Sequence, residues 1–141
     1  MEGELEWDRL HQTLYATDAS VYKILPLAVA FPKNDNDLIL LIDFARAHQT
    51  SLIPRTAGTS LAGQCVGKGI VVDLSKHFTA ILDLDIAGQS VRVQPGVNRD
   101  ALNDYLKPHG LFVGPKNSTS ALCMIGGVVA NNCSGTTSIR Y

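Results

Sequence analysis

Short apolar runs separated by polar stretches predict alternating strands and helices in the first half of the chain. Residues 26–32 form an apolar run bracketed by prolines, and 52–54 and 70–74 are further short runs typical of buried strands. Between the first two runs, residues 37–48 carry apolar side chains at helical spacing, preceded by Asn and Asp residues suited to a helix N-cap. The pattern predicts a strand–helix–strand unit with parallel strands, which places the segment after residue 54 at a strand's carboxyl end.

The middle of the chain predicts an antiparallel hairpin followed by a helix. Residues 79–86 and 90–94 form the two strands. Asp83 and Asp85 alternate with apolar residues, so both carboxylates are expected on the solvent face rather than in acid–base chemistry. Residues 98–107 are predicted to form a helix that Pro108 and Gly110 end. Its expected buried side chains are Ala101, Leu102, Tyr105 and Leu106.

Both ends of the chain contain segments that we interpret as helices. Residues 5–15 have roughly helical apolar spacing, and we expect Trp7 and Tyr15 in that helix to pack in the core. The apolar run 122–130 is predicted to be a buried helix, although it contains Gly126 and Gly127, which weaken an exposed helix by about 1 kcal/mol each relative to alanine. Close packing against a neighbouring backbone or a ligand would explain these two glycines.

A loop of small residues, 54–64, follows the predicted strand 52–54. Gly58 and Gly63 lack a Cβ, so the backbone there can adopt unusual φ values and approach a ligand closely. Consecutive N–H groups in such a loop can form a nest for an anion such as pyrophosphate. An ordinary surface turn is the alternative interpretation. The glycine spacing fits neither a Walker A loop nor the Rossmann fingerprint.

Composition restricts the class of protein. The chain has 141 residues, 45% of them hydrophobic and 18% charged, with a net charge of −1, which predicts one globular domain without broad attraction to nucleic acid. No apolar run has the length of a membrane span, and the acidic N-terminus does not resemble a signal peptide, so a cytoplasmic location is expected. Cys65, Cys123 and Cys133 form no Cys-x-x-Cys pair, and no metal site is predicted.

Two sequence blocks resemble one known family. The first block is Pro54-Arg55-Thr56-Ala57-Gly58-Thr59-Ser60-Leu61-Ala62-Gly63, followed by Val71-Val72-Asp73-Leu74-Ser75. The second runs from Gly114-Pro115 through Ser118-Thr119-Ser120 and Gly126-Gly127 to Asn132-Cys133-Ser134-Gly135. Together they resemble the FAD-linked oxidases of the vanillyl-alcohol oxidase (PCMH) type, and most closely the N-terminal part of bacterial D-lactate and glycolate dehydrogenase-like flavoproteins.

The resemblance implies an α+β fold and a division into parts. A PCMH-type FAD-binding domain has a first subdomain with a small mixed or parallel sheet flanked by helices, and then a second subdomain. On this chain we expect an N-terminal helix over 1–17, the first FAD-binding subdomain over 18–110 and the truncated start of the second over 111–141. The chain would then be an N-terminal fragment.

The resemblance also implies the cofactor and its contacts. FAD would be bound noncovalently, because Thr59 stands where covalent flavoproteins of this superfamily carry histidine. The predicted cofactor-binding residues in the first block are Arg55, Thr56, Ala57, Gly58, Thr59, Ser60, Gly63 and Gln64. Those in the second block are Pro115, Ser118, Gly126, Gly127, Asn132, Ser134 and Gly135. Lys116-Asn117 departs from the family pattern, which leaves the shape of that loop open.

The function implied by the resemblance is oxidation of a small 2-hydroxy acid of the D-lactate or glycolate type, with hydride transfer to FAD. The catalytic and substrate-binding residues would lie beyond Tyr141, so the fragment alone is expected to be inactive and to form homodimers. Peripheral association with the inner membrane face stays open, and no nucleic-acid partner is expected. The alternatives are a flavin-free interaction module of the same fold and a reductase resembling UDP-N-acetylenolpyruvoylglucosamine reductase.

Overall fold

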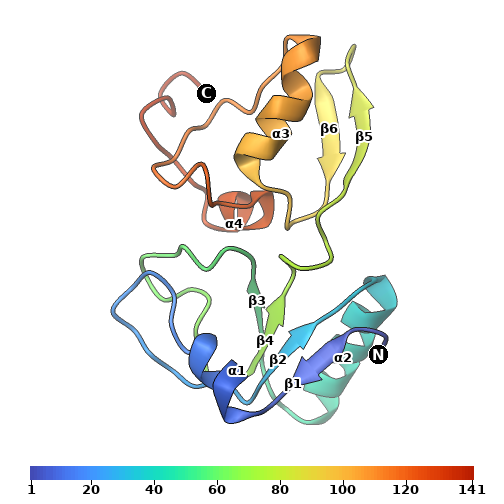
Figure 1. The fold of residues 1–141 in the computed structure, drawn as a ribbon, viewed down its shortest axis with the longest axis vertical. Coiled ribbons are helices and arrows are strands. Elements are labelled where there is room, and N and C mark those ends of the chain that lie inside the picture. The colour runs from blue at the N-terminus through green and yellow to red at the C-terminus, as the bar shows by residue number, and fades with distance from the viewer. The chain divides into compact units, whose positions relative to one another are not determined.

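The computed structural model describes residues 1–141, which divide into two compact units, Met1–His77 and Phe78–Tyr141 (Figure 1). The first unit contains β1 (Glu4–Glu6), α1 (Arg9–Leu14), β2 (Ala28–Phe31), α2 (Asp35–Ala47), β3 (Leu52–Arg55) and β4 (Ile70–Asp73). The second contains β5 (Ile81–Asp85), β6 (Ser90–Val93), α3 (Arg99–Leu106), the 3₁₀ turn η1 (Lys107–His109) and α4 (Ile125–Ala130). The predicted subdomain boundaries at residues 17 and 110 stay predictions.

The first unit is built on a small mixed sheet, one of the two sheet types that the family resemblance implied. Its strand order is β1-β2-β4-β3, with β2, β4 and β3 parallel and β1 antiparallel to β2. All four residues of β2 and of β4 are buried, which fits apolar runs without alternation. Arg55 and Asp73 are in register at the carboxyl ends of β3 and β4.

The helix α2 covers one face of this sheet. The buried cluster there joins Leu41 of the helix to Ala28, Ala30, Ile70 and Val72 of the central strands. Asn34 caps the helix by accepting a hydrogen bond from the Asp37 N–H. The predicted helix 37–48 is therefore confirmed, with its start two residues earlier.

Asp37 fixes the start of the chain to this helix. Its carboxylate is 1% exposed and accepts hydrogen bonds from the N–H groups of Glu2, Gly3 and Lys33. Burial opposes ionisation, but these three hydrogen bonds lower the pKa of Asp37. The carboxylate thus holds the strand β1 at the edge of the sheet.

The predicted helix over residues 5–15 is wrong in its first part. Glu4–Glu6 pair with β2 as the strand β1, and the helix α1 begins only after Asp8, which caps it. Trp7 lies between the two elements and is 69% exposed, so it does not pack in the core. The conformation of residues 4–6 is determined by main-chain pairing with β2, which the spacing of side chains does not reveal.

The second unit joins the β5–β6 hairpin to α3 (Figure 1). Val97, Leu102 and Leu106 form its buried cluster, against which Leu84 and other partly buried hydrophobic residues pack. A register shift between Ile81 and Asp83 interrupts the hairpin, and Leu82 is 54% exposed. Asp83 and Asp85 are exposed, as predicted.

Two predictions about the second unit are corrected. In α3, Ala101 and Tyr105 are exposed, whereas Arg99 is buried with Leu102 and Leu106. In the tail, a helix is confirmed over Ile125–Ala130, but it begins three residues later than predicted and contains no fully buried residue, so the prediction that it is buried is wrong. No helix of the chain has both the length and the apolar character of a membrane span.

Candidate functional site

The predicted anion-binding loop lies where the sequence placed it, at the carboxyl end of a parallel strand. Residues 56–69 lead from the end of β3 to the start of β4, with no helix between these two strands. A parallel connection usually contains a helix. Its absence leaves a long irregular segment at the edge of the sheet where ligands of α/β sheets commonly bind.

Consecutive backbone donors in this loop have no acceptor within the chain. The N–H groups from Thr56 to Ser60 donate none of the backbone or side-chain hydrogen bonds of the structure. Thr56, Ala57, Gly58 and Thr59 are half-buried, and Ser60 is buried. Backbone N–H groups without an acceptor in the chain remain available to water or to a ligand. A row of such groups fits an anionic group with several acceptor oxygens.

Positive φ angles at two glycines produce the shape of the loop. Gly58 has φ 67° and Gly63 has φ 75°, values that L-residues rarely adopt. A Cβ at Gly58 would lie 2.5 Å from the guanidinium of Arg55. A Cβ at Gly63 would lie 2.7 Å from the ring of Tyr22. Both glycines are therefore required by backbone conformation, and both contact a side chain at close range.

The far end of the loop is held by its own polar groups. The Ser60 hydroxyl accepts hydrogen bonds from the N–H groups of Ala62 and Gln64, at 3.3 and 3.4 Å. The Cys65 thiol donates to the Asp18 carboxylate at 3.6 Å. Burial opposes ionisation of Asp18, but hydrogen bonds from Ser20 and Cys65 lower its pKa. Gln64 is exposed, and its side chain is not among the groups that hold the loop.

Arg55 provides the positive charge at the beginning of the loop. Its Nη1 donates to the carbonyl of Thr17 at 2.7 Å, and its Cζ lies 5.1 Å from the centre of the Tyr15 ring. None of the chain's ion pairs involves Arg55. The guanidinium therefore lies beside Gly58 and the free N–H groups without forming an ion pair.

Tyr15 and Asp73 complete this end of the site, and sequence reasoning did not assign either of them to it. The Tyr15 hydroxyl donates to Oδ2 of Asp73 at 2.5 Å, and Asp73 is 4% exposed. Burial, and then the hydrogen bond to Asp73, raise the pKa of Tyr15 well above its ordinary value. The two residues are 58 positions apart, and only the position of Asp73 at the end of an apolar strand could have indicated it.

The second predicted block belongs to the second unit, and a buried arginine organises its first part. Arg99 donates from Nε to the Pro115 carbonyl at 2.9 Å and from Nη2 to the Val113 carbonyl at 3.0 Å. Arg99 is 4% exposed, and its position at the start of α3 carried no signal for this role. Ser118 is exposed in the turn that follows Pro115.

The glycines of the second block have local structural reasons. A Cβ at Gly126 would lie 2.6 Å from the Pro95 side chain, and the Gly126 N–H donates to the Pro95 carbonyl at 2.8 Å. A Cβ at Gly135 would overlap the backbone of Lys116. The Gly127 carbonyl accepts from the N–H of Asn131. Close backbone packing within this unit thus accounts for Gly126 and Gly135 without a ligand.

The remaining residues of the block lie after α4. Asn132 adopts a positive φ of 46° in the turn that ends the helix, a conformation that Asn tolerates better than most residues. Asn132 and Ser134 are exposed. Gly135 therefore packs against the backbone of Lys116, the residue that follows Pro115. Ser118, Asn132 and Ser134 lie at the surface.

A hollow of about 380 Å³ in the second unit does not coincide with the predicted residues. Its walls come from the hairpin, from the end of α3 and from the following segment, and include Leu84, Val91, Leu106, Phe112 and Tyr141. No predicted cofactor-binding residue lines it.

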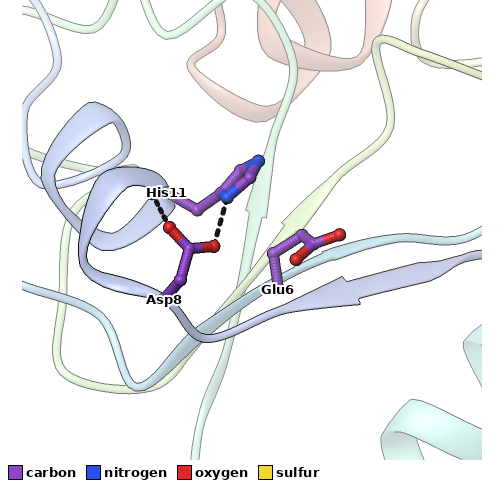
Figure 2. A group of neighbouring side chains, drawn as sticks. All are labelled: Glu6, Asp8 and His11. Atoms are coloured by element: carbon purple, nitrogen blue, oxygen red, sulfur yellow. Dashed lines mark hydrogen bonds and ion pairs between the residues drawn. The ribbon is translucent and has the colours of Figure 1, made fainter.

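A group of titratable side chains lies at the start of α1, shown in Figure 2. Ligand-type atoms of Glu6, Asp8 and His11 lie within 4.8 Å of one another. Asp8 accepts from the N–H groups of Leu10 and His11 and contacts the His11 ring at 2.5 Å, and the hydrogen bond with His11 lowers the pKa of Asp8. These contacts are those of a helix cap, and nothing in them requires a metal ion.

Three comparisons relate the chain to known proteins. A family model described as FAD binding domain matches residues 26–141. D-2-hydroxyglutarate dehydrogenase from Haemophilus influenzae is 42% identical over 99% of this chain and 14% of its own length. Glycolate oxidase subunit GlcD from Escherichia coli is 33% identical over 86% of this chain and 25% of its own length. The chain therefore spans a small part of the relatives that it matches.

Sequence similarity extends to a third named dehydrogenase, and structural similarity to a synthase. The mitochondrial cytochrome-type D-lactate dehydrogenase of Kluyveromyces lactis is 37% identical over 82% of this chain and 20% of its own length. A solved structure of an alkyldihydroxyacetonephosphate synthase covers 97% of this chain with a TM-score of 0.85 and 19% identity. The structural match, at this low identity, concerns the fold alone.

Proposed function

Because the chain belongs to the FAD-binding domain family, we propose that its loop over residues 56–60 binds the pyrophosphate of FAD. The observation that carries this proposal is the row of free N–H groups from Thr56 to Ser60 beside the unpaired Arg55. A pyrophosphate provides several acceptor oxygens and negative charge, so it matches both features.

The individual side chains have different roles in this proposal. Gly58 gives the backbone its left-handed conformation, and Gly63 does the same where the loop meets Tyr22. Thr56 and Thr59 add hydroxyl donors, and Arg55 adds a charge-assisted donor. Ala57 contributes its N–H group, and Ser60 both an N–H group and the hydroxyl that orders the end of the loop. Gln64, which is exposed, is proposed to lie near the flavin.

For the second block we propose contacts to the flavin and ribityl parts of FAD. Ser118, Asn132 and Ser134 are exposed polar residues that can donate hydrogen bonds. Pro115, Gly126, Gly127 and Gly135 are then the backbone positions that set the course of this segment. No histidine or cysteine lies within 54–64, so this loop holds FAD noncovalently in the proposal.

The complete protein containing residues 1–141 is proposed to oxidise a small 2-hydroxy acid. The relatives described above carry names for dehydrogenases or an oxidase of D-2-hydroxyglutarate, glycolate and D-lactate, which share a hydroxyl group next to a carboxylate. Bound FAD supplies a two-electron acceptor for such a reaction. This chain's own part is to bind and orient the cofactor through the loop and Arg55.

The proposal is tested on the purified complete protein. We expect an absorbance band at about 450 nm, and flavin in the supernatant after acid precipitation. Loss of the band when a D-2-hydroxy acid is added without oxygen would support the reaction class. A protein that takes up no flavin on reconstitution would contradict the proposal and favour the flavin-free interaction module. Colour that stays with the acid pellet would contradict noncovalent binding.

A further inference from the structure

Arg55 and Asp73 have opposite charges and adjacent positions, yet they form no ion pair. The two residues are in register on neighbouring parallel strands, so their side chains leave the same face of the sheet. Asp73 instead accepts hydrogen bonds from the Tyr15 hydroxyl at 2.5 Å and from the Ser75 N–H and hydroxyl at 2.7 and 2.6 Å. Arg55 donates to the Thr17 carbonyl. Because a guanidinium and a carboxylate form the strongest common side-chain pair, their separation needs a cause.

Tyr15 contacts both residues. Its hydroxyl donates a hydrogen bond to Oδ2 of Asp73, and the centre of its ring lies 5.1 Å from the Arg55 Cζ. The Phe31 ring meets the Tyr15 ring edge-to-face at 5.8 Å and helps to hold its plane. The hydroxyl satisfies one carboxylate oxygen, and the ring face attracts the guanidinium without neutralising it. One side chain thus provides a partner for each charge.

We propose that Tyr15 is a positioning residue that keeps Asp73 from pairing with Arg55, so that the guanidinium remains available to the phosphate groups of the bound cofactor. This inference rests on the proposed function of the loop. It adds a residue that lies outside the matched family segment and that touches no proposed cofactor atom.

The location of the Arg55 guanidinium links this arrangement to the loop. A Cβ on Gly58 would lie 2.5 to 2.9 Å from three guanidinium atoms, so the charged group lies against the backbone of the free N–H row. If the guanidinium turned towards Asp73, it would leave this position. Removal of the Tyr15 hydroxyl leaves a buried carboxylate oxygen without its donor, and such a group strongly attracts a nearby cation.

The test is an FAD titration of the complete protein and three variants, with flavin fluorescence as the readout. For Tyr15→Phe, which keeps the ring, we expect the dissociation constant to rise about tenfold, because Arg55 pairs with the carboxylate. Asp73→Asn should bind FAD within about threefold of the unmodified protein. The double variant should return to the affinity of Asp73→Asn, since no carboxylate remains to capture Arg55.

A purely structural role for Tyr15 gives the opposite result. In that case the double variant binds as weakly as Tyr15→Phe or more weakly, and this outcome overturns the inference. Tyr22→Phe is the matched control, because Tyr22 also packs on the loop and its hydroxyl makes no hydrogen bond. Tyr22→Phe should leave the dissociation constant unchanged, and an equal loss in it also overturns the inference.

Two results of the titration distinguish a failure of the proposed function from a failure of the inference about Tyr15. If the unmodified protein binds no FAD, the proposed function fails; if it binds and the double variant does not recover, only the role of Tyr15 fails. Circular dichroism shows whether each variant is folded. Should Tyr15→Phe not fold alone, the double variant is compared with Asp73→Asn: equal affinity supports the inference, and about tenfold weaker binding contradicts it.

Discussion

The Tyr15 hydroxyl donates a 2.5 Å hydrogen bond to Oδ2 of Asp73, which joins the end of α1 to the carboxyl end of β4. The same tyrosine ring faces Arg55 at the start of the proposed pyrophosphate loop. The N-terminal segment therefore lies beside the proposed loop, although the matched family model begins after it, at residue 26.

This hydrogen bond predicts a pH dependence of stability. Burial, followed by the bond to Asp73, raises the pKa of Tyr15 above its ordinary value of 10.0. A pKa that is higher in the folded than in the unfolded protein adds stability that is complete below pH 10.0 and is lost as the pH rises through the folded value. Tyr15→Phe should therefore show a smaller loss of unfolding free energy between about pH 8 and about pH 11.

Urea denaturation at the two pH values measures this difference. Tyr105→Phe is the control, because Tyr105 is 46% exposed and makes no hydrogen bond through its hydroxyl. It should keep the full alkaline loss of the unmodified protein. An alkaline loss in Tyr15→Phe as large as that in the control would show that Tyr15 is not bonded in this way.

Gly58 and Gly110 allow backbone strain to be separated from cofactor binding. Both have φ angles near the left-handed region, 67° and 69°, but a Cβ at Gly110 would meet nothing within 4 Å. Alanine at either position should lower the unfolding free energy by roughly 1 kcal/mol, because both backbones disfavour a Cβ. Only Gly58→Ala should also reduce flavin content, since it disturbs the free N–H row and Arg55. Normal flavin content in a folded Gly58→Ala protein would exclude this loop as the pyrophosphate site.

Arg99 is predicted to hold the segment that contains Pro115. Arg99→Met keeps much of the side-chain volume but leaves the carbonyls of Val113 and Pro115 without their donor. We expect the unfolding free energy to fall by about 3 kcal/mol, and lysine to rescue little of it, because it lacks the planar guanidinium.

The control for Arg99 is Arg92→Met. The Arg92 side chain is 75% exposed, and its contact with Asp83 spans 3.9 Å, so its removal should cost less than about 0.5 kcal/mol. Thermal denaturation compares the two variants. Equal losses of unfolding free energy in the two variants would mean that the buried contacts of Arg99 do not stabilise the protein.

The sheet and the loop were predictable because their signals are local. Apolar runs without alternation indicated β2 and β4, and the glycines with flanking hydroxyl residues indicated an irregular loop after β3. The strand β1 was not predictable, since Glu4–Glu6 is a short, charged segment that owes its conformation to pairing with β2. The wrong expectation of a helix there came from apolar spacing alone.

The polar contacts of the candidate site were harder to predict from the sequence than the sheet and the loop. Tyr15 and Asp73 are 58 positions apart, and nothing in the local sequence links the two residues. Arg99 was missed because a charged residue at a helix start is expected in solvent. Its burial is explained by its two carbonyl partners together with the Asp100 carboxylate, 3.1 Å from Nη1. The run 122–130 has the composition of a buried helix, yet the structure leaves Leu122 and Val129 exposed, at 65% and 73%.

Backbone amide exchange across residues 56–60 tests the central claim most directly. The free N–H groups of Thr56–Ser60 should exchange rapidly with deuterium when FAD is absent and become protected when it binds, because pyrophosphate oxygens then accept their hydrogen bonds. Peptides from the β5–β6 turn, where Gln89 already donates to Ile86, serve as the internal control and should not change. Protection of 56–60 on addition of FAD is the predicted result. Bound FAD with undiminished exchange in 56–60 would contradict the account.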